Sequence, residues 1–377
     1  MKIIYFSLNY TTHDRRFLLK LAESSHEIWF LRLQNDCSIY EKRPLPPEIM
    51  QITLQDDYIK ELTPESLLRL MPDLESILSK INPDLIHAGP VQSCGFMTAI
   101  TGFHPFLIMS WGSDILVDAE KNKMNNWMTR YALSHSDMLV CDCSAVRNKV
   151  HQLVSYEDEH IVQFPWGVEL SEFQGQKDRF DWRAYLGWKN NIVIISTRSW
   201  EKLYGIDTIL NAFHRAYMCD SRLRLILIGN GSQEKEIMKY IKMNVLDDVI
   251  FLPGRINNDH MIDYLIAADM YVSASHSDGS SVSLLEAMAI GLPVIVSDIP
   301  SNREWVMSDR NGWLVSSDDS KCISRAILKA ANLSLEERKQ IYRNNSQMVE
   351  ERANWDKNSQ LLSDTYNKLY KKMKLNY

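Results

Sequence analysis

Two carboxylates stand eight positions apart in the segment SHSDGSSVSLLEAMAIGLPVIVSD, residues 275–298. Asp278 precedes a Gly-Ser-Ser bend, and Glu286 follows within a pattern that predicts a helix over 281–290. Gly291 supplies the stop signal for that helix, and a proline two residues later prevents its continuation. One acid is therefore expected in the loop before the helix and the other inside the first turns.

The start of this helix has the chemistry of an anion-binding site. Free backbone N–H groups and the positive end of the helix dipole both favour a negative charge there. The loop acid accepts hydrogen bonds from hydroxyl groups, so the ligand would carry both hydroxyls and phosphate. The helix-start residues concerned are Gly279, Ser280, Ser281, Val282 and Ser283. An N-capped helix with a solvent-facing Glu286 explains the same pattern, and both interpretations stay open on local physics.

Two cations follow the predicted strand 192–196. Arg198 and Lys202 come after the carboxyl end of that strand, where open α/β sheets bind their ligands. A guanidinium forks onto phosphate oxygens, and an ammonium acts as a point charge. The pair predicts a phosphate contact, with a solvated loop as the alternative when the group is taken alone.

A glycine pair, Gly229-Asn-Gly231, follows the predicted strand 223–228. It resembles the start of a dinucleotide fingerprint, but Glu234 stands where the third glycine belongs. A nicotinamide site is therefore rejected, and we expect a loop that lets backbone approach a ligand. Metal chemistry has little support, because no Asp-x-Asp occurs anywhere in the chain.

The elements that position these residues form two α/β series. Short apolar strands alternating with helical segments predict parallel βαβ units in a doubly wound sheet. A break at 164–173 separates the series, and the chain is helical after 318, ending in a helix long enough to return to the first domain. The predicted strands are 2–6, 27–33, 85–87, 107–110, 138–140, 192–196, 223–228, 249–252, 270–273 and 294–296.

Composition restricts the class of protein. A chain of 377 residues is long enough for two domains, and a net charge of −6 argues against a nucleic-acid partner. The apolar start is too short for a signal peptide, and no apolar run approaches the ~20 residues of a membrane span. We expect a cytoplasmic protein or one peripheral to the inner face of a membrane. The six cysteines contain no CxxC pair and are expected to be reduced thiols.

A series of short motifs runs in order through residues 190–315. They are Arg198…Lys202…Gly205, Gly229-x-Gly231, Pro253-Gly-Arg255, Ala268-Asp269 and Ser275-x-x-Asp278-Gly…Leu285-Glu286-Ala-Met-Ala-x-Gly-x-Pro293-Val. This order resembles the retaining GT-B glycosyltransferases of family 4 (glycosyltransferase group 1), which include relatives of glycogen and sucrose synthase. Segments 164–173 and 311–315 are similar to that family's linker and closing strand. The N-terminal half is similar only in architecture and in short pieces such as 83–87.

The resemblance implies a GT-B architecture of two Rossmann-like doubly wound α/β domains facing across a cleft. Residues 1–170 would form the acceptor-side domain and residues 175–350 the nucleotide-sugar domain. Residues 351–377 would form a C-terminal helix that packs back on the N-terminal domain.

The resemblance also assigns roles. Glu286 would hold the ribose hydroxyls, Asp278 the transferred sugar, and Arg198 and Lys202 the leaving diphosphate, aided by the N–H groups of 281–283. Further donor-side positions are Gly229, Arg255 and Ile256, and the acceptor-side positions are Asn9, His13, Arg16, His87, Gly89 and Asp114. The chain departs from the family twice: it has Asp278 where the family has Glu, and Tyr204 where the family has Lys.

The implied activity is that of a hexosyltransferase. It would move a sugar from a UDP- or GDP-sugar to a carbohydrate or lipid-linked acceptor with retention, in polysaccharide or glycoconjugate synthesis, and without a metal or other cofactor. A non-catalytic sugar-nucleotide-binding subunit that supports a partner transferase is the alternative. The basic segment 368–374 and the segment 121–130 with Trp127 are each either a membrane contact or a solvated helix end.

Overall fold

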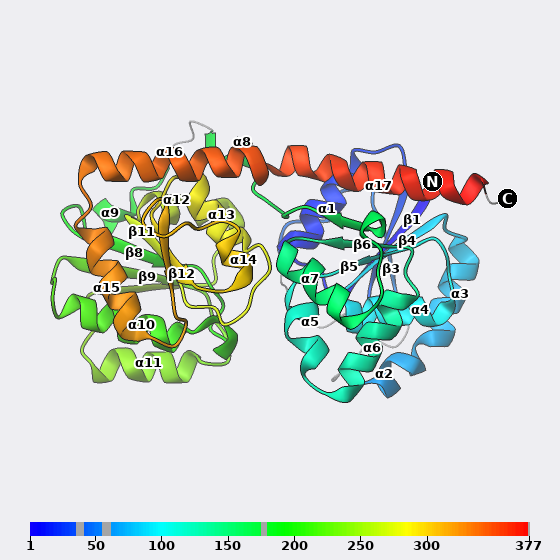
Figure 1. Cartoon of the computed structure of the whole chain (residues 1–377), viewed down its shortest axis with the longest axis horizontal. Helices are drawn as coiled ribbons and strands as arrows, with labels where there is room; N and C mark the ends of the chain where they lie inside the picture. Colours follow the sequence, from blue (N-terminus) through cyan, green and yellow to red (C-terminus); the bar gives the residue numbers. More distant parts are fainter. Residues whose placement is uncertain (35–40, 55–61, 175–178, 376–377) are drawn as a thin grey trace. The chain divides into compact units, whose positions relative to one another are not determined.

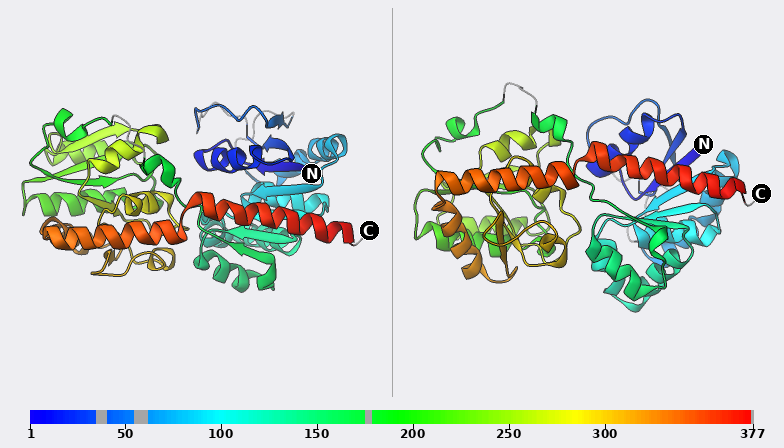
Figure 2. Two further views of the ribbon diagram at one scale, coloured as in Figure 1. Left: turned by 90° about the horizontal axis from the view of Figure 1, so that it is seen from above. Right: turned by 45° about the horizontal axis from the view of Figure 1, so that its top comes forward.

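The computed structural model describes residues 1–34, 41–54, 62–174 and 179–375 (Figure 1). The chain divides into two compact units, Met1–Pro165 with Asp356–Tyr377, and Trp166–Trp355. Each unit contains one parallel sheet with helices between most successive strands (Figure 2). The predicted α/β class with two doubly wound sheets is confirmed.

The sheet of the first unit has the strand order β3-β2-β1-β4-β5-β6-β7. Its central strands are largely apolar because helices cover both faces of a parallel sheet. The two edge strands escaped prediction, since both are short and only partly buried. The strands are β1 (Lys2–Ser7), β2 (Glu27–Arg32), β3 (Met50–Thr53), β4 (Leu85–Gly89), β5 (Phe106–Met109), β6 (Met138–Cys141) and β7 (Ile161–Gln163).

Helices connect these strands in the first unit. The principal helices are α1 (Thr12–Ala22), α2 (Pro64–Arg69), α3 (Met71–Ile81), α4 (Phe96–Thr101), α5 (Ser113–Leu116), α6 (Lys123–Ser134) and α7 (Ser144–Leu153).

The sheet of the second unit has the strand order β10-β9-β8-β11-β12-β13. The chain runs outward from β8 to β10, then returns to the other side of β8 and runs outward again. Its strands are β8 (Ile192–Ser196), β9 (Leu223–Ile228), β10 (Ile250–Gly254), β11 (Met270–Ser273), β12 (Val294–Ser297) and β13 (Gly312–Val315).

The helices of the second unit follow the same alternation. They are α8 (Leu170–Gln174), α9 (Trp182–Tyr185), α10 (Ile206–Tyr217), α11 (Glu234–Met243), α12 (Asn258–Ile266), α13 (Val282–Ala289), α14 (Pro300–Arg303), α15 (Ser320–Ala331) and α16 (Leu335–Arg352).

The last helix, α17 (Trp355–Leu375), belongs to the first unit along almost its whole length (Figure 2). Its apolar face is buried through Leu362 and Leu369, and the amide of Asn358 donates to the carbonyl of Pro165 at 3.1 Å. The hydroxyl of Tyr366 lies 2.5 Å from Nδ1 of His87 on β4, and both side chains are buried. The predicted return of the C-terminal helix to the first domain is confirmed.

The cysteines and the helix hydropathy agree with the composition. Cys94, Cys141, Cys143, Cys219 and Cys322 are free thiols, and Cys37 lies outside the described residues. Among the described helices, none combines the length and the hydropathy that a membrane span requires.

The burial of His87 predicts a pH-dependent stability. Burial lowers the pKa of His87 from 6.5 to about 3. Between these values the unfolded chain binds the proton and the folded chain does not, so the free energy of unfolding rises with pH through this window. Lowering the pH from 7 to 5 is expected to cost the first unit about 2 kcal/mol at this residue.

The matched variant is His87→Gln, which retains a hydrogen-bond partner for Tyr366 but does not titrate. Urea unfolding at pH 5, 6 and 7 measures the effect, with hydrogen exchange of the β4 amides as the probe of the first unit. We expect a smaller pH slope in the variant than in the wild type, whatever their absolute stabilities. Equal slopes in the two proteins would show that His87 is not the titrating group.

Candidate functional site

The order of strands in the second unit reverses between β8 and β11. These strands are neighbours in the sheet, although more than seventy residues separate them in the chain. Ligands of open α/β sheets bind outside the carboxyl ends of the strands at such a reversal. The loop after β8 carries Arg198, and the loop after β11 carries Asp278 and leads into α13. The topology therefore brings the two groups that the sequence singled out to one place.

Helix α13 begins as predicted, with Ser281 as its N-cap residue. The side chain of Ser281 makes no capping hydrogen bond to the helix. Its hydroxyl instead lies 2.8 Å from Nη1 of Arg198. The interpretation as a side-chain-capped helix therefore does not account for Ser281, and the N–H groups of the first turn keep the anion-binding character that a helix start provides.

Arg198 is the centre of a polar cluster. Its Nη2 lies 2.7 Å from Oδ2 of Asp278, and Nη1 also donates to the hydroxyl of Ser283 at 3.1 Å. The guanidinium carbon lies 4.2 Å from the centroid of the Tyr204 ring. Both charged side chains are largely buried, with 12% and 20% of the surface of Arg198 and Asp278 exposed. These contacts therefore fix the position and the orientation of the Arg198 guanidinium.

Two tyrosines, which the sequence did not assign to this cluster, complete it. Tyr271 on β11 is fully buried, and its hydroxyl lies 3.0 Å from that of Ser283. Within an apolar strand it is indistinguishable from a core aromatic. Tyr204 stands where the resemblance led us to expect a lysine, and this departure was the available signal. Its ring replaces a cation with a surface on which Arg198 stacks.

Burial and pairing act in opposite directions on the pKa values of the pair. Burial raises the pKa of Asp278 above its ordinary value, and the charge of Arg198 and hydrogen bonds offset part of that rise. Burial by itself lowers the pKa of Arg198, but attraction by Asp278 and the neighbouring tyrosines outweighs it, so this pKa is raised. Arg198 therefore stays charged, and its Nε is a buried donor with no hydrogen-bond partner among the described residues.

Glu286 is buried in α13, with 8% of its surface exposed. The alternative of a solvent-facing glutamate is therefore wrong. A buried carboxylate requires polar partners, which makes this side chain more than a helix-surface charge. Beside it, Gly279 and Ser280 are buried in the loop, and Nε1 of Trp305 donates to the Ser280 hydroxyl at 3.2 Å.

The glycine pair has a packing role. A Cβ atom added at Gly229 would lie 2.6 Å from the carbonyl oxygen of Arg198, and one at Gly231 would lie 2.5 Å from that of Trp200. The two glycines therefore let their loop pack directly against the loop that carries Arg198. The close approach of protein backbone accounts for the two glycines, and the expected approach of a ligand at Gly229 stays a prediction.

The remaining donor-side residues lie on the surface of the second unit. Lys202 is exposed at the start of a 3₁₀ turn, Lys202–Tyr204. Arg255 is exposed directly after β10, and Ile256 beside it is half-buried against the core.

Three acceptor-side candidates have structural explanations in the first unit. Asp114 is buried and accepts from the N–H of Val91 at 3.1 Å and from the Ser110 hydroxyl at 2.7 Å. His87 has no exposed surface, and a Cβ atom at Gly89 would lie 2.5 Å from the carbonyl oxygen of Met109. These contacts serve the packing of the unit, and a contact of the three residues with an acceptor stays a prediction.

The other three candidates lie near the ends of β1 and β5. His13 is half-buried, and its ring lies 5.9 Å from that of Trp111. Arg16 is buried on α1, and the amide of Asn9 donates to the side-chain oxygen of Gln34 at 3.1 Å.

A metal site has little support within the described ranges. Glu157, Glu159 and His160 could each offer one ligand atom within 4.8 Å of one another. The two glutamates are exposed, and the group lies in the first unit, whereas Arg198 and Asp278 lie in the second.

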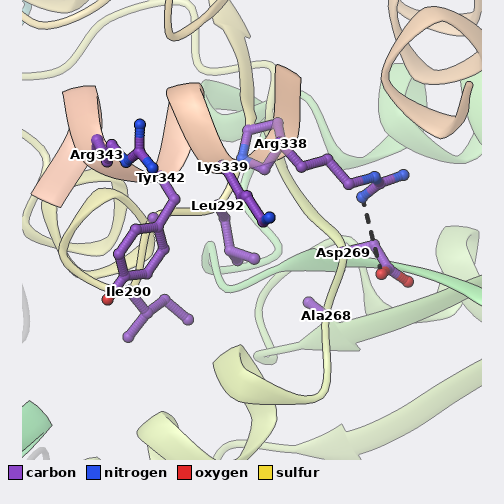
Figure 3. Close-up of a pocket in the computed structure, with 10 residues that line it drawn as sticks. Ala268, Asp269, Ile290, Leu292, Arg338, Lys339, Tyr342 and Arg343 are labelled. Atoms are coloured by element: carbon purple, nitrogen blue, oxygen red, sulfur yellow. Dashed lines mark ion pairs between the residues drawn. The ribbon is translucent and has the colours of Figure 1, made fainter. Parts of the chain in front are cut away.

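A pocket of about 390 Å³ lies elsewhere on the second unit (Figure 3). It is formed before the amino ends of β11 and β12, opposite to the strand ends that carry Arg198 and Asp278. Asp269 in its wall pairs with Arg183 at 2.6 Å and faces Arg338 at 3.9 Å. Arg338 also donates to the last carbonyls of α15. Asp269 and Arg338 are thus engaged in the fold, and the pocket contains none of the predicted site residues.

Comparison with known proteins agrees with this arrangement. The family model "Glycosyl transferases group 1" matches residues 178–348, and "Glycosyl transferase 4-like" matches residues 2–143. N-acetyl-alpha-D-glucosaminyl L-malate synthase of Bacillus anthracis is 22% identical over 80% of this chain and 78% of its own. The putative teichuronic acid biosynthesis glycosyltransferase TuaC of Bacillus subtilis is 25% identical over 58% of this chain, which spans 54% of its length.

Solved structures share the fold of the whole chain. Sucrose-phosphate synthase from Thermosynechococcus elongatus superposes with a TM-score of 0.82 at 17% identity, covering 98% of this chain and 99% of its own. Anabaena HepE, solved in complex with UDP-glucose, gives a TM-score of 0.80 at 18% identity, covering 98% and 100%. The two family models together account for most of both units. The chain therefore belongs to the group 1 glycosyltransferases and is a glycosyltransferase of the GT-B fold.

Proposed function

We propose that the second unit binds a nucleotide-diphosphate sugar, a UDP- or GDP-sugar, and that the enzyme transfers the sugar to an acceptor hydroxyl with retention of configuration. One observation carries this proposal: a buried cation, a carboxylate and a helix start converge at the strand reversal between β8 and β11. A diphosphate needs the cation and the helix N–H groups, and a sugar needs the carboxylate. Complexes of HepE with UDP-glucose support this choice of donor class by analogy.

The roles follow from chemistry and position. Arg198 and the first turn of α13 meet the charge that develops on the leaving diphosphate, and this kind of preorganised stabilisation is usually the largest catalytic contribution. Asp278 accepts hydrogen bonds from the transferred sugar, and Glu286 accepts them from the ribose. Lys202 adds a second positive charge, while Arg255 and Ile256 lie along the base.

The chemical step is a substitution at the anomeric carbon. The bond to the diphosphate breaks with oxocarbenium character, and the acceptor hydroxyl attacks from the same face. Its proton passes to an oxygen of the leaving phosphate. We propose that no metal ion takes part, because the chain lacks an Asp-x-Asp motif and already supplies cations for the phosphates.

The acceptor is proposed to be a carbohydrate or a lipid-linked sugar bound by the first unit, near Asn9, His13 and Arg16. Two relatives, the putative teichuronic acid biosynthesis glycosyltransferase TuaC of Bacillus subtilis and the putative colanic acid biosynthesis glycosyltransferase WcaL of Escherichia coli, support such an acceptor by analogy. A peripheral contact with the inner face of a membrane belongs to the same proposal. Met124 and Trp127 on α6 expose 47% and 51% of their surface beside Lys121 and Lys123. In the basic segment 368–374, the side chains beyond residue 371 lie outside the described part.

The direct test is an assay of the purified chain with UDP- and GDP-sugars, first by thermal stabilisation and then by transfer to oligosaccharide and lipid-linked acceptors. NMR of the product gives the anomeric configuration, and a parallel reaction contains EDTA. We expect retention and an unchanged rate with the chelator. Inversion or loss of activity with EDTA would refute those parts of the proposal. Binding without transfer to any acceptor would favour the non-catalytic subunit.

Glu286→Ala tests the nucleoside end of the donor site. A charged group that loses its hydrogen bonds to a ligand costs about 1.5–3 kcal/mol, so we expect donor affinity to fall roughly 10- to 100-fold. Calorimetry with UDP and GDP measures it. Inorganic pyrophosphate is the control ligand, because it lacks the ribose and should bind both proteins equally. An equal loss for pyrophosphate would mean that Glu286 supports the site as a whole.

Arg198→Ala tests the leaving-group role. Loss of one preorganised donor costs roughly 10²–10³ in kcat, and we expect a smaller change in KM for the donor. Arg222→Ala removes an exposed arginine paired with Asp220 in the same unit and should leave both constants unchanged. A KM effect alone in Arg198→Ala would assign this residue to ground-state binding rather than to the transition state.

A further inference from the structure

Both terminal nitrogens of Arg198 are already engaged by the protein, whereas its Nε has no hydrogen-bond partner among the described residues. One terminal nitrogen faces Asp278 at 2.7 Å, and the other donates to the hydroxyls of Ser281 and Ser283 at 2.8 and 3.1 Å. The Tyr204 ring covers one face of the guanidinium. A phosphate oxygen that approaches these terminal nitrogens therefore meets an edge that a carboxylate already holds.

We propose that Asp278 competes with the diphosphate for Arg198 and thereby lets the site distinguish the sugar-bearing donor from the bare nucleoside diphosphate. This inference rests on the proposed function. A carboxylate and a phosphate seek the same forked edge of a guanidinium, and two anions on one cation repel each other. Because both side chains are mostly buried, solvent and salt screen this repulsion only weakly.

The sugar-bearing donor and the product diphosphate differ in the hydrogen bonds that they offer to Asp278. The donor carries sugar hydroxyls, which donate to the carboxylate and compensate it for its weakened pair with Arg198. The product diphosphate has no hydroxyl at that position and leaves the displaced carboxylate with unmatched charge. Burial makes such a mismatch costly. Asp278 thus weakens binding of the product more than binding of the donor, which favours product release.

The surrounding contacts make the competition specific to this acid. Ser283 is fixed from behind by the Tyr271 hydroxyl at 3.0 Å and contacts Ser281 at 3.1 Å. The serines and the Tyr204 ring restrain Arg198 in its present place. The cation is therefore shared between Asp278 and the ligand instead of swinging from one to the other.

Asp278→Asn removes the competing charge while retaining the shape of the side chain. Calorimetry with UDP and GDP, and with UDP-glucose and GDP-mannose, measures the effect on the wild type and the variant. We expect the nucleoside diphosphate to bind about 10-fold more tightly to the variant. Affinity for the sugar nucleotide should rise less, so that the preference for donor over product falls. Product inhibition of transfer should increase in parallel.

Two controls separate competition from a general charge effect. Asp318→Asn removes the same charge from an exposed position of the second unit, where 80% of the side chain is exposed, and should leave both affinities unchanged. In an Arg198→Ala background, Asp278→Asn should no longer tighten diphosphate binding, since the contested cation is gone. Asp278→Ala repeats the test should the asparagine variant fold poorly.

The outcomes divide clearly. If the wild type binds UDP or GDP and neither Asp278→Asn nor Asp278→Ala binds it more tightly, the competition is overturned and the proposed function still stands. The competition is also overturned if Asp318→Asn makes nucleoside diphosphate binding equally tighter. Binding that appears only in the Asp278 variants supports it. If neither the wild type nor the variants bind any of the four nucleotides, the proposed function and this inference both fail.

Discussion

A buried guanidinium is tolerated only beside groups that balance its charge and accept its hydrogen bonds, and this constraint organises the second unit. Arg198 brings together the loops after two strands and the first turn of a helix. Asp278 balances its charge, two serine hydroxyls accept its hydrogen bonds, and the Tyr204 ring covers its face. Tyr271 supports the serines from within the sheet. Each member of the cluster is thus held by another.

Topology makes this convergence possible. Parallel strands end at one edge of the sheet, and the reversal of strand order places β8 beside β11. The loops that follow diverge to opposite sides of the sheet at that point, which leaves room for a ligand. Gly229 and Gly231 contribute by letting the loop after β9 pack against the Arg198 loop without a side chain between them.

The first unit uses polar residues for a different purpose. His87 joins the central strand β4 to Tyr366 on the returning helix, and Asp14 on α1 lies 3.1 Å from the hydroxyl of Tyr5 on β1. Burial raises the pKa of Asp14 and lowers that of His87, so each is disposed to the neutral form that its surroundings favour. Residue types that resemble catalytic groups in a sequence here secure helices to the sheet.

The sequence by itself determined the alternation of strands and helices, the start of α13 and the family, because hydrophobic periodicity, turn residues and motif order are local properties. It also indicated Arg198, Asp278 and Glu286, since their types and spacing suit a phosphate and hydroxyls. Only the tertiary structure decided that Arg198 and Asp278 are a pair, that Tyr271 joins their polar cluster and that His87 is buried against Tyr366. These findings depend on contacts between residues far apart in the chain and on the burial of their side chains. Spacing along the sequence shows neither the contacts nor the burial.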